Sequence, residues 1–468
     1  MNRYLALIIA MLSGAELQAF QLAPRLVVNI TIDQLRSDYM EAFTPLFKAE
    51  GFRKLLSQGI VYDAASYPFT PIERASAIAT ITTGTTPYYH GIIGNRWLDR
   101  KTLRPTFCVD DSKHYASPHR LTTSTIGDEL KVNTQGNAIV WGIAATRDAA
   151  ILSAGHAADG ALWFDENSNR WRTSTYYSTS TPEWLKSYTS NLTKSDKSKT
   201  LTNDDIAETA LYVVKSASMG KDDVSDLLSI TLSAAKPEGY ATDWQTEMES
   251  IYLQLDNTLE RFISGIESII GNGKVLFVVT STGYADEAES DLSQYRIPTG
   301  TFYINRTANL LNMFLSAVYG QGHYVETCFR NEMFLDHKLL EQKRISISDI
   351  LQHSQDFLVQ NAGVADVYTS ERLLNGNNDI LRYRNGFNPT LSGDIIVKVA
   401  PGWQLVNEES QETFNSRNGF VPIPLIFYGN GIEPRRISTP VTIDRIAPTI
   451  AKSIRIRAPN ACSAEPLF

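Results

Sequence analysis

The segment Leu26–Asp38, with the sequence LVVNITIDQLRSD, constrains the possible fold more than any other part of the chain. Aliphatic and β-branched residues run almost without interruption up to Asp33, and a helix-compatible stretch follows. A run this uniformly apolar predicts a central strand that is buried on both faces of an α/β sheet. Ligands of open α/β sheets bind beyond the carboxyl ends of the strands, which is where Asp33 would lie. Spacing alone favours another role for Asp33, because an aspartate at such a position commonly caps the next helix.

Further apolar runs alternate with amphipathic helical segments along the chain. This alternation predicts an α/β fold, a doubly wound sheet with helices on both faces. The pattern is interrupted between about residues 100 and 200, and it loosens again between about 296 and 389, which predicts cap-like insertions at both places. The expected strands cover residues 138–143, 227–232, 275–279, 395–397 and 424–429, and the main helices cover residues 206–219 and 246–270.

The amino terminus and the charge bear on location and partners. Residues 1–19 combine a basic start, an apolar stretch and small residues, which is typical of a secretory signal peptide and is too short to span a bilayer. We therefore expect residues 20–468 to be exported to the periplasm or cell envelope, or secreted, with no membrane span after cleavage. The net charge of −8 gives no electrostatic basis for binding nucleic acid. The three cysteines, Cys108, Cys328 and Cys462, allow at most one disulfide.

Five blocks of sequence, in the same order as in the family, resemble the alkaline phosphatase superfamily. The likeness is strongest to phosphate-irrepressible alkaline phosphatases and to nucleotide pyrophosphatase/phosphodiesterases, and it spans nearly the whole mature chain. Each block is weak alone, but their order makes the expected fold specific. The blocks are Val28–Tyr39, Thr83–Trp97, Ser153–Asp165, Leu425–Gly429 and Asp444–Pro466.

The resemblance implies a site in which two zinc ions, held by Asp and His side chains at strand ends, flank a Thr or Ser nucleophile. Two cations can stabilise the entering and leaving oxygens of a phosphoryl group in transfer. One metal ion also lowers the pKa of the nucleophile. Such chemistry requires a hydroxyl, about three carboxylates and about three imidazoles that converge on one spot.

Matched position by position, the chain retains little of that site. Asp33 falls on the first metal-ligand position, Asn95 falls on the position that contacts a substrate phosphoryl oxygen, and Arg74 falls on the nucleophile position. Losing about five of six ligands would remove most of a metal-binding free energy on the order of 10 kcal/mol. The other ligand positions fall on Lys236, Tyr240, Ser281, Thr282 and Phe420, and the phosphate clamp falls on Thr146 and Asp148.

The substitutions lead to an electrostatic hypothesis for Asp33. Arg74 and Lys236 bring cationic side chains to the places of the nucleophile and a metal ligand. We hypothesise that a side-chain cation pairs with the Asp33 carboxylate, which would otherwise be a buried charge without compensation. The alternative is that both cations point to solvent from loops.

The resulting expectation is a pseudoenzyme with no catalytic residue and no cofactor, which acts as a binding, scaffold or envelope-assembly component. A resemblance in fold does not carry the activity when the site is lost. Another envelope protein is the expected partner, and a small anion is the expected ligand of the remnant pocket. The pocket residues are Asp33, Arg74, Asn95, Lys236, Tyr240, Ser281 and Thr282.

The alternative expectation is a divergent, zinc-dependent hydrolase of phosphate or sulfate esters with a rebuilt site. The acidic residues at 286–289 would contribute to it, unless they simply form a solvated loop. His90 and His156 are predicted to be structural, because neither has a partner at metal-ligand spacing. The candidate recruits are the acids Glu73, Glu238, Asp286, Glu287 and Glu289 and the hydroxyls Thr70, Ser76 and Ser281.

Overall fold

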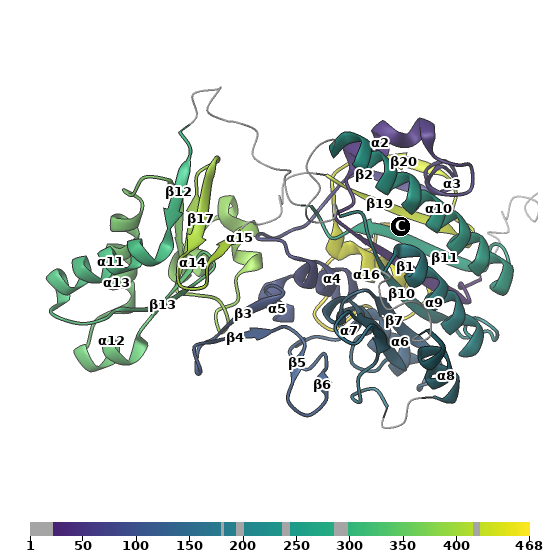
Figure 1. Cartoon of the computed structure of the whole chain (residues 1–468), viewed down its shortest axis with the longest axis horizontal. Coiled ribbons are helices and arrows are strands. Elements are labelled where there is room, and N and C mark those ends of the chain that lie inside the picture. The colour runs from purple at the N-terminus through teal and green to yellow at the C-terminus, as the bar shows by residue number, and fades with distance from the viewer. Residues whose placement is uncertain (1–21, 179–181, 193–200, 236–243, 285–297, 415–421) are drawn as a thin grey trace, which may run out of the picture.

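The structure is a computed structural model that describes residues 22–178, 182–192, 201–235, 244–284, 298–414 and 422–468. The largest feature of these residues is a ten-stranded sheet, on the right of Figure 1. Its strands follow the order β20 (Arg435–Ile437), β2 (Ile60–Ser66), β19 (Ile423–Gly429), β11 (Val275–Ser281), β1 (Leu26–Asp33), β10 (Asp226–Ser233), β7 (Val140–Ala144), β8 (Gly160–Asp165) and β9 (Arg170–Arg172), and β21 (Val441–Thr442) also pairs with β2.

Strand β1 lies in the middle of this sheet and pairs in parallel with β10 and β11. All eight of its residues are buried. Val27 packs into the hydrophobic core on one face, whereas Leu26 and Val28 pack into the core on the other face. Because both faces are covered, β1 is apolar at most positions. The prediction of a buried central strand that ends at Asp33 is confirmed.

Helices cover both faces of the central sheet, as the sequence predicts for a doubly wound α/β fold (Figure 1). The apolar runs that face these helices form two separate cores, one on each face. One face carries α4 (Arg74–Thr83), α6 (Ile126–Asn133), α7 (Arg147–Ala154) and α16 (Ile446–Ser453), and the other carries α2 (Ser37–Phe43), α3 (Phe52–Gln58), α9 (Asn203–Ser216) and α10 (Trp244–Ile270).

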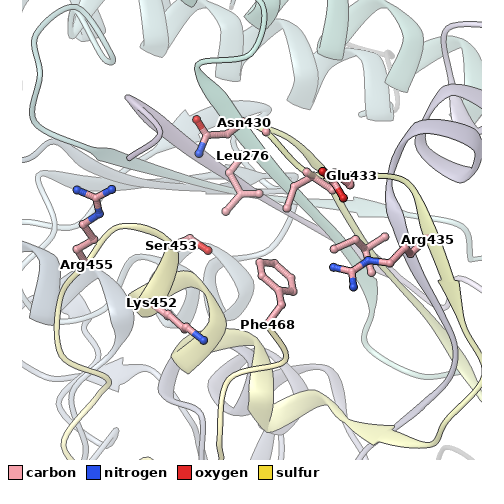
Figure 2. Close-up of a pocket in the computed structure, with 11 residues that line it drawn as sticks. Leu276, Asn430, Glu433, Arg435, Lys452, Ser453, Arg455 and Phe468 are labelled. Atoms are coloured by element: carbon pink, nitrogen blue, oxygen red, sulfur yellow. The ribbon is translucent and has the colours of Figure 1, made fainter. Parts of the chain in front are cut away.

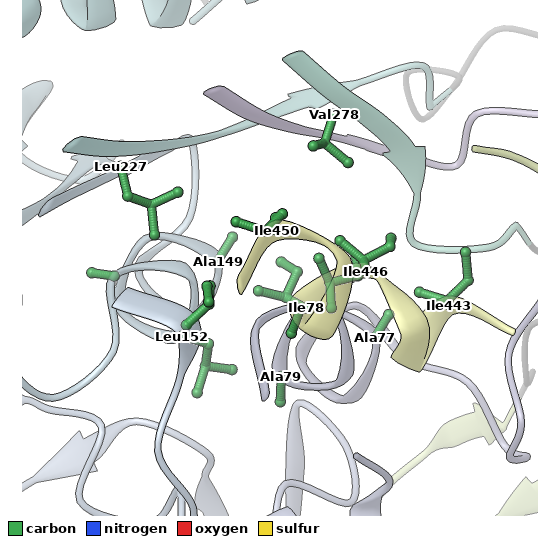
Figure 3. Packing of buried hydrophobic residues seen from close by; sticks show 14 of the residues in the cluster. Ala77, Ile78, Ala79, Ala149, Leu152, Leu227, Val278, Ile443, Ile446 and Ile450 are labelled. Atoms are coloured by element: carbon green, nitrogen blue, oxygen red, sulfur yellow. The ribbon is translucent and has the colours of Figure 1, made fainter. Parts of the chain in front are cut away.

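Small residues let α4 and α7 approach each other and the sheet closely. Figure 3 shows Ala77 and Ala79 of α4 and Ala149 of α7 among the larger aliphatic side chains of this core. Gly142 of β7 has the same role, because a Cβ atom there would lie 2.3 Å from the carbonyl oxygen of Ala150 in α7. This close packing places the first turns of α4 and α7 side by side.

The elements from β12 to β18, residues 300–414, form a unit inserted into the central domain, on the left of Figure 1. This inserted unit has two small sheets of its own. The sequence assigned residues 395–397 to the central sheet, but they belong to the inserted unit, which therefore extends to Phe414, beyond the expected boundary at 389. An apolar run identifies a buried strand but not the sheet to which it belongs. The two sheets are β12 (Gly300–Tyr303), β17 (Trp403–Asn407) and β18 (Glu412–Phe414), and β13 (Val325–Phe329), β14 (Glu332–Leu335), β16 (Ile395–Val399) and β15 (Val364–Thr369), packed with α11 (Ile304–Tyr319), α12 (His337–Lys343), α13 (Ile347–Leu358), α14 (Ser370–Asn375) and α15 (Leu381–Gly386).

The range 100–200 is not an insertion throughout. Strands β7 and β8 lie in it and pair within the central sheet. Two short ladders precede them: β3 (Arg96–Asp99) with β4 (Arg104–Phe107), and β5 (Asp110–Asp111) with β6 (Tyr115–Ala116). Residues 147–154 form helix α7, and its alanines suit a helix packed closely on the sheet.

Two expectations concern the ends of the chain and its thiols. The expected signal peptide, residues 1–19, lies outside the described residues. Within the described ranges, no helix has the length and apolar character needed to cross a bilayer. The thiols of Cys108, Cys328 and Cys462 are all free.

Candidate functional site

Asp33 lies at the carboxyl edge of the central sheet, where β1, β10 and β11 end together. Its side chain is buried, with 7% of the residue exposed. The Thr282 hydroxyl, just beyond β11, donates a hydrogen bond to Asp33 Oδ1 at 2.5 Å. Ser281 is also buried, and its hydroxyl oxygen accepts a hydrogen bond from the Gly283 N–H. The predicted neighbourhood of Asp33 is therefore confirmed for Thr282.

Arg74 is the first residue of α4 and extends between two carboxylates. Its Nε and Nη2 atoms lie 3.0 and 3.3 Å from the two carboxylate oxygens of Asp148, in the first turn of α7. Its Nη1 atom lies 3.9 Å from Asp33 Oδ2. The hypothesis that a side-chain cation faces Asp33 is confirmed for Arg74. Its alternative, a guanidinium pointing to solvent, is wrong.

The two partners keep each other charged. Burial alone would lower the pKa of Arg74, but the carboxylates of Asp148 and Asp33 raise it above the ordinary value. Burial alone would raise the pKa of Asp148, and the Arg74 guanidinium outweighs this and lowers it. The cluster is thus a partly buried ion pair, in which the carboxylates of Asp148 and Asp33 are the buried members.

The N-terminus of α4 is capped by groups of the protein itself. The side-chain oxygen of Asn95 accepts a hydrogen bond from the Ala75 N–H at 3.0 Å. Glu73 and Ser76 form a capping box, in which the Ser76 hydroxyl is bonded to the Glu73 backbone. Free N–H groups at a helix N-terminus are what makes it attract anions. Asn95, Glu73 and Ser76 therefore act here as helix caps.

Glu73 also joins the central domain to the inserted unit. Its carboxylate accepts two hydrogen bonds from Arg330, which lies between β13 and β14, and the Nη2–Oε2 distance is 2.9 Å. Arg96 of β3 forms a second ion pair across the same boundary with Glu412 of β18. We call this boundary the seam. A cavity of about 350 Å³ lies at the seam and is lined by Ile72, Glu73, Arg74, Asn95, Arg96, Arg330, Asn407, Glu412, Thr413 and Phe414.

Several candidate residues lie outside the described ranges, and their placement is not tested. They are the pocket residues Lys236 and Tyr240, the candidate acids Glu238, Asp286, Glu287 and Glu289, and Phe420. Thr70 is described and buried, and its backbone N–H donates to the Arg382 carbonyl of the inserted unit.

The two histidines that lie in the sequence blocks resembling the family, His90 and His156, both have partners within the fold. His90 is fully buried and lies 3.1 Å from the Thr80 hydroxyl, and burial lowers its pKa to about 3. His156 Nδ1 lies 2.9 Å from Asp128 Oδ2, and its Nε2 lies 2.9 Å from the Leu121 carbonyl oxygen. Their predicted structural roles are confirmed.

Two residues of the site were missed from the sequence. Asp148 was noted only because it is not cationic, and Arg330 was not singled out. A signal for Asp148 did exist: the resemblance implies a hydroxyl at position 74 and a cation at the clamp, whereas the chain carries a cation at 74 and a carboxylate at 148. Complementary departures of this kind indicate that the two side chains meet.

The fold and the position of Asp33 define the class, a doubly wound α/β protein with the architecture of the alkaline phosphatase superfamily. The crystal structure of the alkaline phosphatase PafA superposes with a TM-score of 0.83 at 23% identity, over 95% of this chain and 98% of that one. The sequence profile of the type I phosphodiesterase / nucleotide pyrophosphatase family matches residues 27–420. The chain belongs to this family.

Curated relatives match over nearly their whole length. Alkaline phosphatase PafA of Elizabethkingia meningoseptica is 24% identical, over 98% of this chain and 97% of its own length. Alkaline phosphatase PhoV of Synechococcus elongatus is 25% identical, over 93% and 91%. The resemblance recognised from the sequence motifs is confirmed.

The expectation that the protein has no cofactor is wrong as stated. It rested on lost ligand positions, but the chain matches alkaline phosphatases over more than nine-tenths of its length, and the family resemblance implies a two-zinc site. The reasoning drew the loss of the metal from the matched ligand positions alone and gave too little weight to the alternative of a rebuilt site. The zinc content of the purified protein is therefore the measurement that decides whether a metal is bound.

The described residues do not by themselves fit a two-zinc site. Across these ranges, no group of three or more His, Cys, Asp or Glu side chains converges so as to hold a metal ion. The Asp33 carboxylate accepts from Thr282 and faces Arg74. No chemical step through zinc can be derived from these residues.

Proposed function

We propose that this protein is an exported member of the family that binds a ligand or partner through the alkaline phosphatase scaffold and does not transfer phosphoryl groups. The observation that carries this proposal is the partly buried position of Arg74, at the nucleophile position of the family and in contact with Asp148. A guanidinium stays protonated at any pH at which proteins fold, so it cannot attack phosphorus.

The capping of α4 supports the same proposal. A phosphate at the site would have to take the Ala75 N–H from Asn95, and it would approach the carboxylate of Glu73. In addition, the positions that the resemblance gives to the phosphate clamp hold Thr146 and Asp148. Developing negative charge would meet Asp148 where a clamp would supply cations.

The test is turnover of an aryl phosphate and of a bis-aryl phosphodiester by the purified protein, with and without added zinc. We expect rates no higher than those of R74M, a variant that lacks both the guanidinium and any hydroxyl. Turnover that a chelator abolishes and R74M retains would contradict the proposal and place the chemistry elsewhere.

A second candidate is a divergent, metal-dependent phosphatase or phosphodiesterase. The end-to-end match to alkaline phosphatases favours it, and so does the presence of acidic residues in the chain segments that follow β10 and β11. Near-stoichiometric zinc in the native protein, together with loss of both zinc and turnover in an E238Q or D286N variant, would support this candidate over the first.

The proposed location and partner rest on the sequence. The basic and apolar start of the chain supports export to the periplasm or envelope. The seam cavity has three arginines in its lining, each paired with a carboxylate, so a small anion would bind there by displacing one of these pairs. The loops of the inserted unit are a suitable surface for an envelope protein. Cell fractionation tests the location, and affinity capture of the native protein followed by mass spectrometry tests the partner.

A further inference from the structure

A second cavity, of about 420 Å³, lies at the opposite edge of the central sheet from Asp33. It is bounded by the amino-terminal ends of β2 and β11, by the turn that follows β19 and by the last turn of α16 (Figure 2). We call it the amino-edge cavity. Its lining residues are Ile60, Leu276, Asn430, Gly431, Ile432, Glu433, Arg435, Lys452, Ser453, Arg455 and Phe468.

The floor of the amino-edge cavity is apolar. Figure 2 shows Leu276 and Phe468 extending from opposite sides into the space between the sheet and α16. The Phe468 ring is held in place by an edge-to-face contact with Phe427, with ring centroids 5.1 Å apart. Apolar surface of this kind gains free energy when a ligand removes it from water.

The rim of the cavity is cationic. Arg435, Lys452 and Arg455 surround it, and Glu433 is the single acidic side chain in the lining. Arg435 and Lys452 have no ion pair with any described residue, whereas the arginines of the seam are paired. Unpaired cations around an apolar cavity favour a ligand that carries a negative charge.

The backbone at the rim is held in a costly conformation. After α16, the Arg455 N–H donates to the Lys452 carbonyl, and the Ile456 N–H donates to the Ala451 carbonyl, which is a Schellman motif. The motif puts Arg455 at φ 59°, a position that usually holds glycine. Asn430, on the other side of the cavity, has φ 31°. The Schellman motif thus fixes the position of Arg455 at the rim of the cavity.

We propose that the amino-edge cavity binds a small amphipathic anion, with an acyl or aryl body against Leu276, Ile432 and Phe468 and a carboxylate or phosphate head at the cationic rim. This site is separate from the carboxyl edge, where the family binds its substrates. The proposal therefore does not depend on whether the protein hydrolyses phosphate esters.

The test is isothermal titration calorimetry of the full-length protein with four probes. Decanoate and decyl phosphate carry both parts of the expected ligand, decanamide carries the body without the charge, and acetate carries the charge without the body. We expect one saturable site for decanoate or decyl phosphate, at least tenfold weaker binding of decanamide, no measurable binding of acetate, and weaker binding at high salt. Comparison of the first two probes identifies the preferred head group.

Two variants that lose the same charge test whether the rim cations themselves bind the ligand or whether any loss of positive charge weakens binding. The rim variant R435Q/K452Q should weaken binding of the preferred probe at least tenfold. The control K101Q/R104Q removes the same charge at exposed positions around the turn between β3 and β4 and should bind like the wild type. The floor variant I432E should also abolish binding, and thermal unfolding of each variant confirms that it is folded.

Three results would overturn the proposal. They are the absence of saturable binding of both decanoate and decyl phosphate, equal affinity for decanamide, and an equal loss of affinity in the rim and control variants. Each of these would show that the cavity does not select for an apolar body joined to an anionic head.

Discussion

The two edges of the central sheet differ in how their charges are satisfied. At the carboxyl edge, Arg74 pairs with Asp148, and across the seam Arg330 pairs with Glu73. At the amino edge, Arg435 and Lys452 surround a cavity without carboxylate partners among the described residues. The edge that carries the family's site is thus closed by its own side chains, while the other edge is open to an anion. Position in the fold and availability for a ligand are separate properties.

The first prediction removes the central cation of the carboxyl edge. R74Q leaves the carboxylates of Asp148 and Asp33 close together without compensation, so we expect a loss of about 3 to 5 kcal/mol in the free energy of unfolding. Urea denaturation measures it. The double variant R74Q/D148N should recover most of the loss. A loss below about 1 kcal/mol for R74Q alone would show that the Arg74–Asp148 pair does not stabilise the carboxyl edge of the sheet.

The second prediction concerns the seam. R330Q leaves the partly buried Glu73 carboxylate without its bidentate partner, so we expect a loss of about 1 to 3 kcal/mol. A double-mutant cycle with E73Q measures the coupling between the two side chains. Additive effects of the two substitutions would mean that the seam is not held by this pair.

The third prediction uses pH at another ion pair, His156 with Asp128, which lies near the amino-terminal end of β7. The pKa of His156 is raised: burial opposes the charged form, but the hydrogen bond to Asp128 and its charge outweigh burial. The pKa of Asp128 is lowered by the same pair, against the effect of burial. A raised histidine pKa stabilises the fold below the ordinary value of 6.5, and this stabilisation is lost as pH rises through the folded-state pKa.

We therefore expect H156Q to be less stable than the wild type by about 1 kcal/mol near pH 6. The difference should shrink as the pH rises above the raised pKa. Thermal unfolding of both proteins across this range measures it. A difference that grows with pH would mean that His156 is neutral in the fold.

The smallest effect is expected for an exposed pair near the amino edge. Arg436 lies 2.9 Å from Asp63, and both are open to solvent. Exposed ion pairs contribute about 0.2 to 1 kcal/mol. R436Q should therefore change the urea midpoint far less than R74Q does. Similar effects of the two variants would contradict the contrast drawn between buried and exposed pairs.

The strands of the central sheet could be predicted from the sequence because burial on both faces leaves a continuous apolar run. That argument predicted the strands at 227–232 and 275–279, which lie within β10 and β11. It misplaced residues 395–397, which carry the same pattern in β16. A local apolar run indicates that a strand is buried, but the sheet to which the strand belongs depends on pairing with residues distant in the sequence.

Only those site residues that lie in or near a recognisable sequence motif could be predicted. Asp33, Arg74 and Asn95 were identified because each belongs to or lies near a recognisable block. Their partners could not be found in the same way, since Asp148 lies 74 residues from Arg74 and Arg330 lies 257 residues from Glu73. Such pairs form only when the topology brings α7 and the inserted unit to the first turn of α4.

The position of β2 in the sheet affects how the chain folds during its synthesis. Its neighbours in the sheet are β19 on one side and β20 and β21 on the other. All three come from residues beyond 422, so residues 60–66 leave the ribosome long before any strand exists for them to pair with. Contacts this distant in sequence slow folding. Until the last strands arrive, β2 and β11 each present an unpaired backbone edge, and a nascent chain of this kind needs protection from aggregation.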